Sequence, residues 1–301
     1  MSKIKKDIRQ DIDPKSVEKQ NKGLMKDGLW VVKELIVFVL LLFLGQVLYA
    51  LCFTLGIPEA RQNMEIFQDI FFSKTVVNQA YYFGHIFVML CLVVMTLSKA
   101  RSNNSLGKTT IDKFFEEIDW KPLKNTFVGI NCFAVGLTMQ SVLTTIISLF
   151  AILVLGREMG NTTAFYSIST WSIFIIGLVI PIAEELLFRG RIMKRLAQRF
   201  DEKKANKIQA IGYAIIHGIS AYSVSDFAMG IMFGKMKKMY GTIIAPLLAH
   251  IGANALNALL YTYPNLLTYR AFSIIYCIVL VYGAGVLLFL LFKHVWNKTK
   301  K

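Results

Sequence analysis

Two adjacent carboxylates stand at the end of a long apolar stretch. Glu184 and Glu185 follow the run SIFIIGLVIPIA, and Arg189 comes four residues after Glu185. Residues four apart share a helix face, so Glu185 and Arg189 are expected to form an ion pair. Glu184 is rotated from Glu185 by about 100° and is free to point into a helix bundle. Charges inside hydrocarbon are costly, so the pattern marks a candidate functional carboxylate.

Two histidines and an asparagine follow at helical spacing in later apolar stretches. Tyr213 and His217 are one turn apart, as are His250 and Asn254, so each pair shares a helix face. A glutamate beside a histidine is a plausible general base for a water molecule. A histidine and an asparagine on another helix are plausible donors to a developing oxyanion. Together with Glu184, these side chains are the minimum set for hydrolysing an amide.

Each motif taken alone also has a purely structural interpretation. A Glu-Arg pair suits a helix end at the interface, a single histidine in an apolar helix is more often a packing residue, and a His-Asn pair suits hydrogen bonding between helices. The motifs are more informative together. Only four histidines occur, at positions 85, 217, 250 and 294, and two of them lie within apolar spans in the same half of the chain as the glutamate pair.

In order, spacing and placement, these motifs resemble those of the CAAX protease and bacteriocin-processing family, which includes the Abi proteins and the Ras-converting endopeptidase. The resemblance covers about residues 169–260, and one position departs mildly from it, because Tyr213 stands where phenylalanine is usual. It implies an intramembrane endopeptidase with an eight-helix membrane fold.

The resemblance also implies a role for each motif residue. Glu184 and His217 would activate the hydrolytic water, and His250 and Asn254 would stabilise the tetrahedral oxyanion. The residues that would support or line the site are Glu185, Arg189 and Tyr213.

The resemblance leaves metal dependence open. Glu184, His217 and His250 are a set that could bind catalytic zinc with one open position. The zinc helix pattern His-Glu-x-x-His is absent from the sequence, and asparagine is a poor zinc ligand. We therefore expect a glutamate-type site with no cofactor, and zinc is the alternative.

The elements that position these residues are expected to be membrane helices. The chain is 55% hydrophobic, and the apolar residues lie in long blocks. A helix needs roughly 20 apolar residues to cross the hydrocarbon core. This predicts an all-α polytopic membrane protein of about eight spans, at residues 31–56, 76–98, 127–155, 169–188, 208–221, 224–236, 242–261 and 270–293. The fifth and sixth are short, so 208–236 is either two spans or a re-entrant pair.

Loop charges predict the orientation. The net charge of +15 is concentrated in every second loop, which places both termini in the cytoplasm by the positive-inside rule. The site then lies in the cytoplasmic half of the bundle. The expected division is a basic tail over 1–30, a membrane domain over 31–293 and a basic tail over 294–301.

The same charge distribution bears on partners. Basic residues placed between apolar blocks favour contact with anionic lipids over nucleic acid. The expected partners are membrane lipids and a peptide or membrane-anchored protein substrate, and the composition favours a bacterial plasma membrane. Residues 110–124 mix aromatic and charged side chains and fit either an interfacial amphipathic helix or a solvated loop. The four cysteines lie in apolar stretches without a CxxC pair and are expected to be packing residues.

Two other functions compete with a peptidase. A catalytically silent protein of the same fold could act as a scaffold, regulator or bacteriocin-immunity factor. A transporter would suit broken helices with ionisable residues, but no inverted repeat is visible and the polar residues gather in one place.

Overall fold

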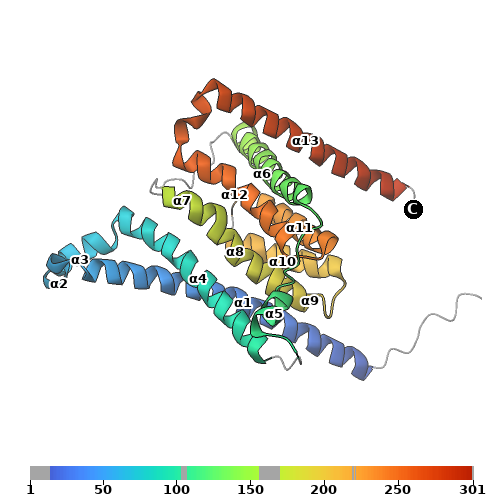
Figure 1. Cartoon of the computed structure of the whole chain (residues 1–301), viewed down its shortest axis with the longest axis horizontal. Coiled ribbons are helices and arrows are strands. Elements are labelled where there is room, and N and C mark those ends of the chain that lie inside the picture. The colour runs from blue at the N-terminus through green and yellow to red at the C-terminus, as the bar shows by residue number, and fades with distance from the viewer. Residues whose placement is uncertain (1–13, 103–106, 156–169, 219, 221, 300–301) are drawn as a thin grey trace, which may run out of the picture.

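The computed structural model describes the chain except for residues 1–13, 103–106, 156–169, 219, 221 and 300–301, and every regular element in the described part is a helix (Figure 1). Five helices are long and apolar enough to cross a membrane, and a sixth apolar helix, Ile244–Leu259, is shorter. The five are Met25–Leu55, Lys74–Ser102, Thr126–Val154, Trp171–Leu196 and Arg270–Phe289. The all-α polytopic class is therefore confirmed, whereas the count of eight spans stays a prediction.

The N-terminal arm is a pair of long helices that pack on each other, α1 (Pro14–Leu55) and α4 (Lys74–Ser102). Two short helices, α2 (Pro58–Gln62) and α3 (Met64–Phe71), join them at one end. Helix α1 begins well before its apolar block, so much of the expected N-terminal tail is helical. Its polar end is docked against the rest of the protein. Buried Asp27 pairs with Arg195, and buried Glu34 accepts two hydrogen bonds of 2.9 Å from Arg191.

The helix that carries the glutamate pair is continuous but irregular. It runs through α7 (Thr170–Phe174), a π-helical turn η2 (Ile175–Val179), α8 (Ile180–Glu185), a second π-helical stretch η3 (Leu186–Met193) and α9 (Lys194–Leu196). Single π-helical turns inside α-helices occur frequently at functional sites. In η2 a carbonyl accepts from the N–H five residues later, as the Ile175 carbonyl does from the Ile180 N–H. Pro181 has no N–H, so the next carbonyl in that register, Ile176, lacks its backbone donor.

The short apolar blocks at 208–236 form two helices that pack on each other. Helix α10 (Glu202–Ile216) starts with Asp201, whose carboxylate accepts from the N–H groups of Lys203 and Lys204 at 3.0 Å each. This cap explains why α10 begins six residues before the apolar block. Helix α11 (Ser223–Tyr240) ends at Gly241, whose φ of 67° is left-handed and favours glycine.

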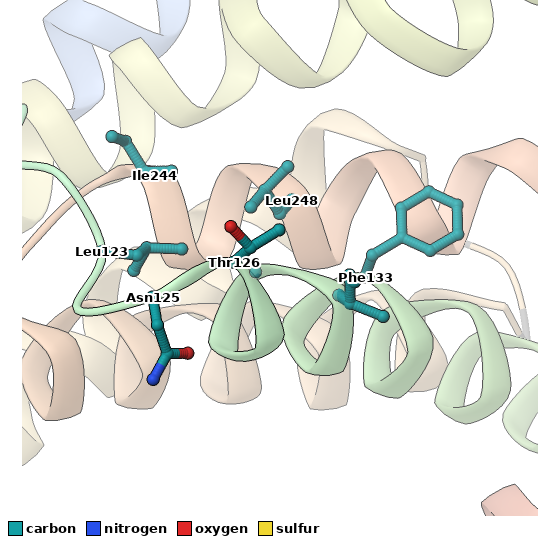
Figure 2. A pocket seen from close by; sticks show the side chains of 8 residues that line it. Leu123, Asn125, Thr126, Phe133, Ile244 and Leu248 are labelled. Carbon is teal, nitrogen blue, oxygen red and sulfur yellow. The ribbon is translucent and has the colours of Figure 1, made fainter.

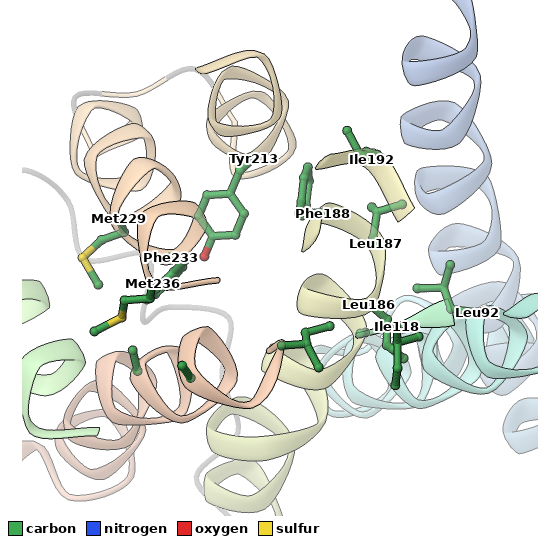
Figure 3. Packing of buried hydrophobic residues seen from close by; sticks show 14 of the residues in the cluster. Leu92, Ile118, Leu186, Leu187, Phe188, Ile192, Tyr213, Met229, Phe233 and Met236 are labelled. Carbon is green, nitrogen blue, oxygen red and sulfur yellow. The ribbon is translucent and has the colours of Figure 1, made fainter. Parts of the chain in front are cut away.

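The remaining helices complete the bundle. They are α5 (Thr110–Glu117), α6 (Thr126–Leu155), α12 (Ile244–Thr262), the 3₁₀ turn η4 (Pro264–Thr268) and α13 (Arg270–Thr299). In Figure 1, the α1–α4 pair lies on one side and α6 with α13 on the other, with α8 and α12 between them. The largest apolar core surrounds this centre, and Figure 3 shows Phe188, Tyr213 and Phe233 facing one another in it.

The segment 110–124 contains the amphipathic helix expected as one of two alternatives. Ile118, just after α5, is buried in the main core, whereas Ile111, Phe115 and Trp120 are exposed. Lys194 holds the end of α5 by donating to the carbonyls of Glu116 and Glu117 at 2.9 and 2.8 Å. The helix is therefore docked on the motif-bearing span, and its location at a membrane surface stays a prediction.

Candidate active site

The Glu185–Arg189 ion pair lies at the centre of the protein. Arg189 Nη1 is 2.8 Å from Glu185 Oε1, and both side chains are almost completely buried. Arg189 also donates to the Gly230 carbonyl at 3.1 Å, and its guanidinium lies 5.0 Å from the ring centres of Tyr213 and Phe233. A buried ion pair is stable only when further hydrogen bonds satisfy its atoms. Arg189 thus joins the glutamate-bearing helix to α10 and α11.

His250 has a protein partner at each ring nitrogen. Its Nδ1 is 2.9 Å from Glu185 Oε1, and its Nε2 is 3.1 Å from the Tyr213 hydroxyl. The ring is buried and stacks on Phe233 at 4.8 Å. A carboxylate can only accept, so Nδ1 carries the proton and Nε2 accepts from the hydroxyl when the imidazole is neutral. His250 becomes a donor at Nε2 only in its protonated form.

Glu184 lies between two imidazoles. Its Oε1 is 3.6 Å from Nε2 of His217, and its Oε2 is 3.6 Å from Nε2 of His250. Nδ1 of His217 donates to the Tyr213 carbonyl at 2.8 Å, which leaves a lone pair on Nε2 of the neutral ring. A carboxylate oxygen and an imidazole lone pair thus face each other across a gap too long for a direct hydrogen bond. A donor beside the pair, such as a water within hydrogen-bond distance of both atoms, satisfies both acceptors.

The burial of these groups differs. Glu184 is 5% exposed and, within the described part of the chain, its Oε2 has no hydrogen-bond partner. The His217 side chain is 31% exposed, because α10 ends just before it at Ile216. A buried carboxylate oxygen without a donor is costly, so this atom marks a place for a polar ligand. The exposed side of His217 is the open side of the site.

Asn254 is placed by the irregularity of the motif-bearing helix. Its Nδ2 donates to the Ile176 carbonyl at 3.0 Å, and this is the carbonyl that Pro181 leaves without a backbone donor in η2. An amide nitrogen carries two N–H groups, so one donor remains after this bond. The asparagine predicted to stabilise an oxyanion therefore also holds α12 against η2.

The structure brings together the residues that the sequence singled out, except that the Asn254 amide contacts the Ile176 carbonyl and no other member of the set. Glu184, Glu185 and Arg189 come from one helix, Tyr213 and His217 from α10 and its end, and His250 and Asn254 from α12. Two further ionisable groups lie near these residues, and the sequence did not single them out as site residues. His85 on α4 and Asp226 on α11 lie within range of charge–charge interaction with Glu184 and His217. His85 is buried, and its Nδ1 bonds to the Tyr81 carbonyl at 2.8 Å. The sequence could have pointed to His85 because it is one of only four histidines in the chain.

The donor set of the site bears on the zinc alternative. A histidine ligand must offer a ring nitrogen to the metal, and both nitrogens of His250 contact Glu185 or Tyr213. Within the residues that the structure describes, no group of three His, Cys, Asp or Glu side chains is arranged to hold a metal ion. As placed, Glu184, His217 and His250 do not form such a group, and the metal dependence of the site stays a prediction.

Comparison with protein families covers this same part of the chain. Residues 166–256 match the family model described as Type II CAAX prenyl endopeptidase Rce1-like. This segment is similar to the Rce1-like family. The match includes both glutamates, Arg189 and the two histidine motifs, and it stops just after Asn254. The Rce1-like segment therefore contains the clustered residues, whereas His85 lies outside it. No curated protein and no solved structure matches the chain.

Proposed function

We propose that the protein is an intramembrane endopeptidase in which Glu184 and His217 activate water for attack on a peptide bond. The observation that carries this proposal is the 3.6 Å gap between the Glu184 carboxylate and the lone pair of His217 Nε2, inside the Rce1-like segment. A water that bridges the two atoms from the open side donates one proton toward each acceptor and keeps its oxygen lone pairs for the substrate carbonyl.

In the proposed reaction, Glu184 first takes up one proton and then returns it. The carboxylate takes a proton from water as the oxygen attacks, and a tetrahedral oxyanion forms. Glu184 then returns the proton to the amide nitrogen as the C–N bond breaks, which releases an amine and a carboxylic acid. The buried position of Glu184 favours this role, because proton transfer is sensitive to the exact placement of the base.

The oxyanion is stabilised from the α12 side of the site. Glu185 is anchored by Arg189 and accepts from Nδ1 of His250, which fixes the orientation of the ring. When Nε2 also carries a proton, it donates to the oxyanion. The second N–H of Asn254 and the Tyr213 hydroxyl are further donors nearby. Donors fixed by packing act without reorganisation when charge develops.

The substrate of the proposed enzyme is a peptide held at the membrane by a lipid or an apolar segment. The matching family model is named for prenylated CAAX proteins, and a site inside a helix bundle reaches chains that are already anchored in the same membrane. Bacteriocin leader peptides and membrane-anchored surface proteins fit the same description. The basic loops place the site in the cytoplasmic half of the membrane.

The test is cleavage of a panel of such peptides by purified protein in detergent. Wild type is compared with Glu184→Gln and His250→Ala, each with and without a chelator. Cleavage that is lost in both variants and retained with the chelator supports the proposal. Loss with the chelator that zinc restores overturns the metal-free mechanism.

A scaffold or immunity role remains the competing function. If wild type cleaves nothing in the panel and Glu184→Gln supports the same cellular phenotype as wild type, the peptidase proposal fails and binding becomes the better account.

A further inference from the structure

Helices α6 and α12 cross at very short distance. A Cβ added to Gly136 would lie 1.7 Å from the Ala249 carbonyl oxygen, and one added to Gly252 would lie 2.1 Å from the Phe133 carbonyl oxygen. Only glycine permits backbones to approach this closely. Toward the N-terminal ends of both helices, a groove of about 600 Å³ opens between them.

The groove is almost entirely apolar. Figure 2 shows Leu123 and Ile244 at one end, Phe133 at the other and Leu248 between them. Gly129 lies in the middle of the groove, and its lack of a side chain leaves room there. An added Cβ would lie 3.3 Å from Leu248 Cδ1, so a larger side chain at this position would fill the groove. Ile130 forms the outer side and is 61% exposed. The groove therefore faces away from the bundle interior, toward the lipid.

The mouth of the groove is basic and held in place. Exposed Lys121 and Lys124 flank the lining residue Leu123. The backbone at Lys121 is fixed to α12 by two bonds to Thr242: its N–H donates to the hydroxyl at 3.1 Å, and the hydroxyl donates to its carbonyl at 2.7 Å. The Ile243 N–H donates to the Asp119 carbonyl at 3.1 Å. The backbone segment that carries these two lysines is thus fixed at the end of the apolar groove.

This groove is separate from the candidate active site. Leu248 and His250 are two residues apart on α12, which places them about 200° apart around the helix. Leu248 faces the groove and His250 faces Glu185 on the other side. A ligand in the groove is not a substrate in the site.

We propose that this groove is a binding site for an anionic phospholipid of the leaflet that contacts the basic loops. One acyl chain lies along Leu248 and Phe133, and the headgroup phosphate pairs with Lys121 and Lys124. The apolar lining matches a hydrocarbon chain, which brings no backbone donors or acceptors to satisfy. A peptide in the same groove would leave such groups unpaired in hydrocarbon. Charge at the mouth selects an anionic headgroup over a zwitterionic one, by about fivefold per lysine.

The test is native mass spectrometry of the detergent-purified protein after incubation with phosphatidylglycerol or phosphatidylcholine. Wild type is expected to retain one phosphatidylglycerol well above phosphatidylcholine. Gly129→Leu fills the groove and is expected to lose this retained lipid. Gly285→Leu is the matched control, because a Cβ at Gly285 meets nothing within 4 Å.

Two further variants keep the test decisive. Ile130→Trp narrows the groove from its exposed side and is expected to weaken retention if Gly129→Leu does not fold. The double variant Lys121→Gln, Lys124→Gln is expected to retain both lipids equally. Equal retention of the two lipids by wild type, or unchanged retention by the variants that fill the groove, overturns the proposal. Since cleavage is not measured, the outcome is independent of the proposed function.

Discussion

The motif-bearing span and the last span have similar apolarity but opposite environments. The most apolar windows of Trp171–Leu196 and Arg270–Phe289 have mean hydropathies of 1.9 and 2.4, yet 67% of the first is buried inside the protein and only 6% of the second. On α13, Ile275, Ile278 and Val281 are more than half exposed and suit contact with lipid. On the inner span, two carboxylates and a guanidinium are buried, and Glu185 and Arg189 are bonded to neighbouring helices.

Apolarity thus identifies a membrane span, whereas the few polar residues of a span indicate whether it lies inside the helix bundle. A charged side chain in a membrane helix requires partners, and partners require other helices around it. If this is correct, substitutions at the buried polar network should have large effects, and substitutions at outward positions and exposed ion pairs should have small ones.

The largest effect is expected at Glu184. Glu184→Gln keeps the shape of the side chain but removes the proton acceptor, so the cleavage rate should fall by about 10²–10⁴-fold. The variant should keep its thermal stability in detergent within a few degrees, because this carboxylate oxygen Oε2 has no hydrogen-bond donor among the described residues. The rate is measured with the best peptide of the panel. Wild-type rates in the variant would remove Glu184 from the mechanism.

A large effect on stability is expected at Arg189. Arg189→Met leaves Glu185 charged and buried without its cation, and breaking a buried pair in this way costs about 3–5 kcal/mol. Lys99→Met breaks the ion pair of Lys99 with Glu117, in which the lysine is 63% exposed. Exposed pairs contribute about 0–1 kcal/mol. Thermal unfolding in detergent should therefore separate the two variants clearly.

The control for this prediction is the double variant Glu185→Gln, Arg189→Met, which removes both charges. It should recover part of the lost stability, since neither charge of this pair is then left without its partner. Equal losses for Arg189→Met and Lys99→Met would contradict the inner-versus-outer comparison.

Much of this arrangement could be predicted from the sequence. The four-residue spacings predicted that Glu185 pairs with Arg189 and that His250 and Asn254 share a face, because helix periodicity is a local property. The apolar blocks predicted the all-α membrane class for the same reason. The bond from Asn254 to Ile176 could not be predicted, because it depends on a π-helical turn and on the packing of two helices 78 residues apart.

The N-terminal segment shows a second limit. Composition predicted a basic tail over residues 1–30, yet α1 begins at Pro14 and Asp27 is buried against Arg195. The segment contains acidic as well as basic residues, and their partners lie about 170 positions away. Ion pairs between residues so far apart in the sequence depend on the tertiary fold, and the local periodicity of the sequence does not predict them.

A smaller effect is expected at Tyr213, the position at which the family that the motifs resemble usually has phenylalanine. Tyr213→Phe keeps the ring between Phe188 and Phe233 but removes the hydroxyl that contacts His250 Nε2 at 3.1 Å. One hydrogen bond contributes about 0.5–1.5 kcal/mol, so kcat should fall a few-fold with KM nearly unchanged. Steady-state kinetics separate the two constants. An unchanged kcat would limit Tyr213 to a packing role.

The smallest effect is expected at the docking of α5, and it depends on pH. Burial opposes ionisation of Asp119, but Lys237 at 2.9 Å and Lys194 at 3.3 Å outweigh it and lower the pKa of this carboxyl. A lowered pKa contributes stability that is present above the unfolded value of about 3.9 and is lost as the pH falls through the folded value. The protection of residues 110–121 against hydrogen exchange, relative to the intrinsic exchange rate at each pH, should therefore fall in acid. Asp119→Asn should show faster exchange already at neutral pH and a weaker acid response, because its side chain cannot ionise. If the variant and wild type respond alike, the acid sensitivity of this segment comes from other carboxylates.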